Sequence, residues 1–275
     1  MPQMQMDIDT FLKRSKLPSL PAVSVRLMEM TAQENVSFPA LGRLLMTDAA
    51  LSAEVLRAAN SPLSGLRTEV KSIPHALTTL GLNRVGMLVV TTALWRSIPG
   101  SINRQLVRAW WRHNLATALL ARHLEGAVDA VQETGYTAGL LHSVGQLALL
   151  GTCPSEYHAV LTRAAGTGLK VSQCEKEALG MDHCELGAAL LEQWRVPAEI
   201  VEAARYHHNP ESARQRSAWL VSVSCDAANF LGYSVFPSRQ RELAELSDAV
   251  REIAADDVLR VMIEDKVNAL ESSLL

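Results

Sequence analysis

The sequence has no excess of basic residues, no regular cysteine spacing and no tract of low complexity. Lys and Arg number 26 against 29 Asp and Glu, which gives a formal charge of −3. Because affinity for nucleic acid depends on a basic surface, we expect no direct nucleic-acid partner. Hydrophobic residues make up 48% of the 275 residues and charged residues 20%. This balance is typical of a globular chain with a sizeable core.

Cysteine is scarce, and the four that occur, at positions 153, 174, 184 and 225, form no CxxC pair. This spacing indicates neither a disulfide framework nor a cysteine zinc site. The first ten residues include Asp7 and Asp9 and lack the basic start and apolar run of a signal peptide. We therefore expect a cytoplasmic protein with reduced thiols.

Charged residues are absent from the stretch between Thr134 and Ser155, which is long enough to suggest a membrane span. His142, Ser143 and Gln146, together with four glycines and Pro154, are more typical of a buried helix. We accordingly expect no membrane partner.

Apolar residues recur with helical periodicity along the chain, and no sustained apolar/polar alternation is present, so the fold is predicted to be all-α. Capping residues predict helix starts at Ser37, Asp48, Ser72 and Asp182, the last paired with Glu185; Pro197 fits a first helical turn. Helix ends are predicted at Asn60, Gly81, Pro99–Gly100, Gly151 and Asn209–Pro210.

Two changes along the chain indicate its organisation. A break around residues 97–103 precedes a long helix-like run from Gln105 to Glu125, which predicts a subdomain boundary near residue 100. Residues 241–275 contain nine acidic and four basic side chains, which indicates an acidic helical tail.

Histidine is the residue type with the most chemical potential here. Of eight histidines, six lie in the second half of the helical region: His113, His142, His158, His183, His207 and His208. Imidazole is a common transition-metal ligand, but no HExxH motif supplies a local ligand set, and a single histidine is more often a hydrogen-bonded core residue.

An ordered set of motifs resembles one known family. Its first half contains Leu17-Pro-Ser-Leu-Pro-Ala-Val, Thr47-Asp-Ala-Ala-Leu and Ser72-Ile-Pro-His-Ala-Leu, and its second half contains Trp111-Arg-His-Asn, Gly139-Leu-Leu-His-Ser-Val-Gly, Leu179-Gly-Met-Asp-His-Cys and Tyr206-His-His. This set resembles the HD-related output domain, HDOD, a degenerate relative of the HD and HD-GYP metal-dependent phosphohydrolases. The resemblance implies a multi-helical HD-like bundle preceded by an N-terminal helical subdomain.

The resemblance extends from about residue 17 to residue 233. We therefore expect an HDOD domain at 17–233. Outside the resemblance we expect a helical extension at 1–16 and, from the composition, an acidic helical tail at 234–275. Within the HDOD domain, we expect an N-terminal helical subdomain at 17–100 and an HD-like subdomain at 101–233.

The resemblance also implies a metal pocket of the HD type. In active relatives, a His, a His-Asp doublet and a further Asp bind one or two metals that activate water. His113 matches the first position, His142 the His of the doublet and Asp226 the last position, while His183, His207 and His208 match additional ligands of HD-GYP enzymes.

The chain departs from this pattern at the doublet, where Ser143 replaces Asp, and at Gln146, where active relatives usually have Lys. A serine hydroxyl is neutral and a poor metal ligand, so we expect no enzyme activity and a vestigial pocket formed by His113, His142, Ser143, Gln146 and Asp226. No cofactor is expected, although a single residual Zn or Fe remains an alternative, held among His113, His142, His183, His207, His208 and Asp226.

Members of the resembled family are bacterial signalling modules, often found with receiver or cyclic-dinucleotide domains. We therefore expect a non-catalytic output domain that contacts signalling proteins such as a sensor kinase, a response-regulator receiver or a cyclic-dinucleotide domain. The alternatives are a phosphohydrolase acting on a nucleotide or cyclic dinucleotide, and a nucleotide-sensing receptor that uses the same pocket.

Overall fold

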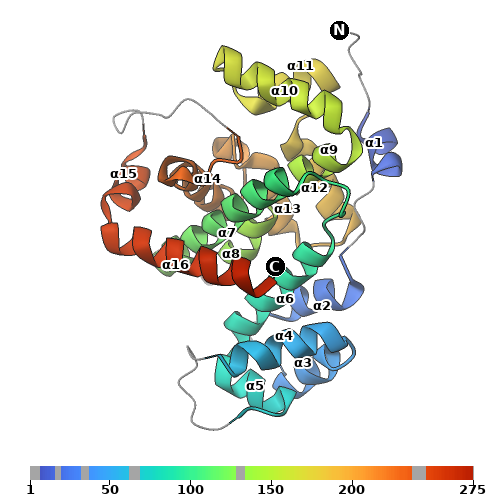
Figure 1. Cartoon of the computed structure of the whole chain (residues 1–275), viewed down its shortest axis with the longest axis vertical. Helices are drawn as coiled ribbons and strands as arrows, with labels where there is room; N and C mark the ends of the chain where they lie inside the picture. Colours follow the sequence, from blue (N-terminus) through green and yellow to red (C-terminus); the bar gives the residue numbers. More distant parts are fainter. Residues whose placement is uncertain are drawn as a thin grey trace. The chain divides into compact units, whose positions relative to one another are not determined.

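A computed structural model describes residues 7–15, 20–31, 37–61, 69–127, 134–236 and 246–274. Within these ranges every regular element is a helix and no strand occurs, which confirms the all-α prediction (Figure 1). The chain forms two compact units. One contains residues 18–97 and 194–196, and the other contains residues 1–17, 98–193 and 197–275.

The smaller unit consists of five helices. They are α2 (Ala22–Thr31), α3 (Phe38–Leu45), α4 (Ala49–Ala59), α5 (Ile73–Leu80) and α6 (Leu82–Arg96). Ser37, Asp48 and Ser72 cap α3, α4 and α5 as predicted, since each side-chain oxygen accepts a hydrogen bond from a backbone N–H in the first turn. Gly81 ends α5 with φ 75°, a conformation that favours glycine.

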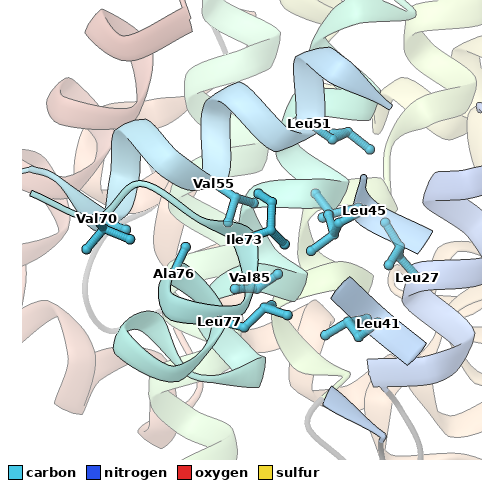
Figure 2. Close-up of a cluster of buried hydrophobic side chains, with 12 residues drawn as sticks. Leu27, Leu41, Leu45, Leu51, Val55, Val70, Ile73, Ala76, Leu77 and Val85 are labelled. Atoms are coloured by element: carbon cyan, nitrogen blue, oxygen red, sulfur yellow. The ribbon is translucent and has the colours of Figure 1, made fainter. Parts of the chain in front are cut away.

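The core of the smaller unit consists of aliphatic side chains from all five helices (Figure 2). Leu27, Leu41, Leu45, Leu51, Val55, Ile73, Leu77 and Val85 are each buried there. Because these residues lie on one face of each short helix, tertiary packing stabilises helices that would be marginal alone.

The larger unit contains the remaining helices. They are α1 (Ile8–Arg14), α7 (Arg104–Ala127), α8 (Gly135–Leu141), α9 (Val144–Thr152), α10 (Pro154–Thr167), α11 (Val171–Leu179), α12 (His183–Gln193), α13 (Ala198–Tyr206), η2 (Pro210–Ser212), α14 (Arg216–Ala228), η3 (Asn229–Tyr233), α15 (Asp248–Ala255) and α16 (Asp257–Leu274). Asp182 and Glu185 cap α12 reciprocally, as predicted: each side chain accepts the other residue's backbone N–H.

The long helix α7 packs against α8, α14 and α16 (Figure 1). Gly139 permits the close approach of α8, because a Cβ at this position would lie 2.7 Å from the Cα of Ala118 in α7. Trp110 and Trp111 are fully buried on α7. This arrangement fixes the position of His113, one turn further along α7.

The uncharged stretch from residue 134 to 155 differs from the single buried helix that its composition suggests. It forms α8 and α9, which are separated at His142 and Ser143, and then starts α10 at Pro154. Both α8 and α9 are buried almost throughout. The break places His142 and Ser143 in the interior.

The acidic C-terminal region forms α15 and α16. Glu271 of α16 is buried and accepts hydrogen bonds from Arg108 and Arg112 of α7, at 2.5 and 2.6 Å. The guanidinium of Arg112 also lies 5.6 Å from the ring centroid of Tyr233. The contacts of Glu271 hold α16 along α7, and the contact of Arg112 with Tyr233 joins α7 to η3.

No single helix in the described ranges has the length and apolar character needed to cross a membrane. The bent pair α5 and α6 meets those criteria when its two helices are taken together, with an angle of 111° between them.

Candidate metal centre

Five of the predicted histidines converge inside the larger unit. His113 lies on α7, His142 follows α8, His183 begins α12, and His207 and His208 follow α13. The rings form a continuous series: centroids are 5.3 Å apart for His113 and His142, 4.8 Å for His142 and His207, and 4.1 Å for His207 and His208. The first four are buried, whereas His208 is exposed.

Two of these histidines cap the helices that position them. The Nδ1 of His142 lies 2.7 Å from the carbonyl oxygen of Gly139, and the Nδ1 of His207 lies 2.8 Å from that of Ala204. Each carbonyl belongs to the last turn of its helix, where it has no intrahelical partner. The helix ends therefore orient both rings.

The carbonyl partners of three histidines determine which ring nitrogen carries the hydrogen. The Nδ1 of His113 lies 3.1 Å from the carbonyl oxygen of Tyr233. Because a carbonyl can only accept, Nδ1 carries the hydrogen in His113, His142 and His207, and Nε2 carries the lone pair. This is the tautomer in which a metal binds at Nε2 and the other nitrogen is held by an outer partner.

Burial keeps these imidazoles neutral. It lowers the pKa of His113 to about 4, and it lowers the pKa values of His142 and His207 well below the ordinary range, assisted in each case by a neighbouring histidine. Neutral imidazole is the form that binds metal ions. All three rings are thus available as ligands at neutral pH.

The first possible metal site consists of His113, His142 and Cys225, all buried. The two Nε2 atoms are 3.3 Å apart, and the Sγ of Cys225 lies 3.6 Å from the Nε2 of His113. Asn229 directs its amide group toward the same sulfur at 3.7 Å. With the hydrogens on Nδ1, two lone pairs face each other, so a cation between them would satisfy both.

The second possible site consists of His183, Cys184, His207 and His208, whose ligand atoms all lie within 4.8 Å of one another. The Nε2 of His183 is buried and has no hydrogen-bond partner among the described residues. Burial opposes protonation of His183, but its neighbours Cys184 and Glu175 raise its pKa above the usual value. Burial also raises the pKa of the Cys184 thiol.

Glu175 of α11 is fully committed to structural contacts beside this second site. It accepts hydrogen bonds from the hydroxyl of Tyr157 at 2.7 Å, from the backbone N–H of His183 at 2.9 Å and from the Nδ1 of His183 at 2.6 Å. A carboxylate behind a histidine is the usual outer partner of a metal-binding ring. Glu175 therefore orients His183, and it belongs to neither ligand group.

Ser143 lies in a closed hydrogen-bond network apart from both groups. Its hydroxyl donates to the side-chain oxygen of Asn114 at 2.9 Å, Asn114 donates to the carbonyl of Trp110, and Trp110 donates to the carbonyl of Ser143. The side-chain oxygen of the nearby Gln146 is buried and has no protein partner within the described ranges.

The structure brings together His113, His142, His183, His207 and His208, and neither ligand group includes Asp226. Ser143 and Gln146 are both buried. Sequence reasoning missed Cys184, Cys225 and Glu175. The two cysteines were nonetheless adjacent to residues that it selected, since Cys184 follows His183 and Cys225 precedes Asp226.

The donor atoms determine which metals fit. Both groups in the described part of the chain offer imidazole nitrogen and cysteine sulfur, and neither offers a carboxylate oxygen. Zinc and ferrous iron suit such donors, whereas magnesium and manganese prefer oxygen. Each group therefore suits a transition metal of this kind, and neither supplies a carboxylate that could bridge two metals.

Comparison with known proteins agrees with this architecture. A crystal structure of an HDOD domain protein of unknown function from Geobacter sulfurreducens has a TM-score of 0.71 and 24% identity, and the match covers 97% of this chain and 94% of that one. A protein from Shewanella amazonensis SB2B, provisionally named a phosphohydrolase, has a TM-score of 0.68 and 24% identity over 95% and 93% of the two chains. These similarities show the fold.

A curated relative, an uncharacterized protein of Treponema pallidum (strain Nichols), is 23% identical over 209 residues, or 75% of this chain. The chain spans 40% of the length of that relative. The family model for the HDOD domain matches residues 17–210, which is more than half of the chain. The chain therefore belongs to the HDOD family.

Proposed function

We propose that this chain is a non-catalytic regulatory domain that transmits a signal by binding another protein. HDOD membership implies a signalling module, and the partners that suit it are a sensor kinase, a receiver domain or a cyclic-dinucleotide domain. The buried histidine pocket is then a remnant of the HD phosphohydrolase site.

The replacement of the doublet carboxylate is the observation that carries this proposal. The Ser143 hydroxyl is neutral and donates to Asn114, so it cannot supply the negative charge that binds a second metal. Two-metal phosphoryl transfer requires that charge to stabilise both the attacking and the leaving oxygen. Glu175, a buried carboxylate beside His183, accepts hydrogen bonds from Tyr157 and His183.

A metal-dependent phosphohydrolase is the main alternative. The convergence of five histidines favours it, and so does the name of the Shewanella relative. A nucleotide receptor that uses the pocket without cleavage is a further alternative. Both predict a small phosphorylated ligand in the pocket, whereas the proposed function requires none.

Hydrolysis assays separate these functions. The full chain is incubated with Mn²⁺, Fe²⁺ or Mg²⁺ and a panel of nucleotides and cyclic dinucleotides, next to His142→Ala. We expect no turnover, and no thermal stabilisation by any nucleotide or cyclic dinucleotide beyond that given by the metal ion alone. Turnover that disappears in His142→Ala would overturn the proposal, and stabilisation without turnover would support the receptor.

Direct binding tests the other half of the proposal. The full chain captures proteins from an extract of its host, and each captured candidate is purified and titrated against it. We expect a saturable complex with a signalling protein. Repeated failure of every purified candidate to bind would count against a role in protein interaction.

A further inference from the structure

We propose that His113, His142 and Cys225 together bind one zinc-like transition-metal ion through two imidazole nitrogens and one thiolate. This inference goes beyond the regulatory function, because it assigns a ligand to the pocket whether or not a protein partner binds. It also differs from the ligand set implied by the family resemblance, in which the carboxylate of Asp226 occupies the last position.

Two of the distances among these side chains, both measured from His113 Nε2, match edges of a zinc tetrahedron. Zinc binds imidazole nitrogen at about 2.05 Å and thiolate sulfur at about 2.3 Å with tetrahedral angles, which places two nitrogens about 3.3 Å apart and a nitrogen and a sulfur about 3.6 Å apart. The observed separations are 3.3 Å between the Nε2 atoms of His113 and His142, and 3.6 Å between Cys225 Sγ and His113 Nε2. Two edges therefore have the dimensions of a metal shell, and the ligand atoms of all three residues lie within 4.8 Å of one another.

The surroundings of the three ligands are organised for a metal as well. The carbonyls of Tyr233 and Gly139 hold the Nδ1 atoms of His113 and His142, so that both Nε2 lone pairs face inward. Asn229 lies within reach of the Cys225 sulfur as a donor, which favours the thiolate over the thiol. All three ligands are buried, and a thiolate there requires a cation.

The second group has weaker geometry for the same role. The sulfur of Cys184 lies 3.9 Å from the Nδ1 of His207 and 4.0 Å from its Nε2, and that Nδ1 already contacts the carbonyl of Ala204. His208, a further member of this group, is exposed. The observations therefore favour the group containing Cys225.

Cobalt substitution tests the site without measuring activity. The full chain is stripped of metal and titrated with Co²⁺, whose bond to a thiolate gives an intense near-ultraviolet absorption band. We expect this band to saturate at one equivalent and to disappear when Zn²⁺ is added. A titration without the band would overturn the proposal.

Four variants locate the metal. Cys225→Ser is expected to abolish the thiolate band, whereas Cys184→Ser, Asp226→Asn and the control Cys153→Ser are expected to retain it. Cys153 is a suitable control because it is a buried cysteine outside both groups and donates to the carbonyl of Leu149. A band that persists in Cys225→Ser and vanishes in Cys184→Ser would overturn the assignment.

X-ray absorption of the zinc-loaded natural chain provides a test that does not depend on any variant folding. We expect one sulfur scatterer at about 2.3 Å together with nitrogen at about 2.0 Å. A shell of nitrogen and oxygen alone would refute thiolate ligation. These readouts are independent of the hydrolysis and binding assays, so failure of the regulatory function and failure of the metal site are distinguishable.

Discussion

The hydroxyl of Ser143 donates a hydrogen bond to the side-chain oxygen of Asn114 at 2.9 Å. Both residues are fully buried. Ser143→Ala would leave the Asn114 oxygen without a donor, and an unsatisfied buried acceptor costs about 1–3 kcal/mol. We expect the free energy of unfolding, measured by urea denaturation, to fall by that amount, and an unchanged value would contradict this contact.

Ser143→Asp restores the doublet of the active relatives, but we expect no hydrolysis from it. The new carboxylate would face the Asn114 oxygen, and both groups are acceptors, so the charge is buried without a donor there. Stability should therefore fall further than in Ser143→Ala. A gain of metal-dependent turnover over the natural chain would show that the carboxylate alone was missing.

The three hydrogen bonds that Glu175 accepts predict that Glu175→Ala destabilises the fold more than Tyr157→Phe does. Tyr157→Phe removes one of its three donors and should cost about 1–3 kcal/mol. Glu175→Ala leaves the hydroxyl of Tyr157 and the backbone N–H and Nδ1 of His183 without an acceptor. The loss of folding free energy should therefore be larger than in Tyr157→Phe. Urea denaturation measures both. Glu177→Gln on the same helix is the control expected to change little, because it weakens only an exposed ion pair with Arg163, and such pairs contribute about 0–1 kcal/mol. The reverse order would contradict the structural role.

The lowered pKa values of His113, His142 and His207 predict a loss of stability in acid. The folded-state pKa of His113 is about 4, below the value near 6.5 of an unfolded chain. As the pH falls from about 6.5 toward 4, the unfolded state takes up the proton first, so folding stability decreases. For His113 alone the loss at pH 5 is about 2 kcal/mol.

Urea denaturation of metal-free protein between pH 6 and pH 4.5 checks this expectation. His142 and His207 act in the same direction, because their pKa values are also lowered. His113→Gln removes one titrating group, so its stability should depend less steeply on pH than that of the natural chain. Equal slopes would contradict the depressed pKa.

Local chemistry explains which parts of the structure could be predicted. The caps at Ser37, Asp48 and Asp182 depend on contacts within three residues, and the sequence shows them directly. The histidine cluster depends on tertiary packing, since His113 and His207 are 94 positions apart. The family resemblance, rather than periodicity, indicated that these residues meet.

The proposed ligand Cys225 and the predicted ligand Asp226 are neighbours on α14, and the sequence does not decide between them. Successive residues on a helix point about 100° apart, so the rotation of α14 determines which of the two side chains faces His113. That rotation follows from the packing of α14 against α7, α8 and α13. A motif match alone therefore cannot decide between two residues that follow each other in the sequence.

The ion pairs of Glu271 with Arg108 and Arg112 are expected to hold the C-terminal helix α16 against α7. Glu271→Gln removes the carboxylate that receives Arg108 and Arg112 while keeping the shape of the side chain. We expect the Tm to fall by about 2–4 °C, the shift produced by roughly 1 kcal/mol in a domain of this size. Proteolysis of α16 should become faster. Glu264→Gln, an exposed change on the same helix, is the control, and equal behaviour of the two variants would contradict the clamp.

The close contact between α9 and α12 predicts that Gly145 cannot be replaced by a larger residue without loss of stability. A Cβ at Gly145 would lie 2.0 Å from the carbonyl oxygen of His183 and 2.8 Å from the backbone nitrogen of Gly187. Because backbone atoms cannot rotate away, Gly145→Ala must push the two helices apart, at a cost of about 3 kcal/mol or more. The same displacement moves His183 and Cys184 at the start of α12.

Gly166→Ala on α10 is the control. A Cβ at this position meets no atom within 4 Å, so the change should cause no loss of stability. Urea denaturation of both variants tests this difference, and comparable stability would show that α9 and α12 do not approach so closely.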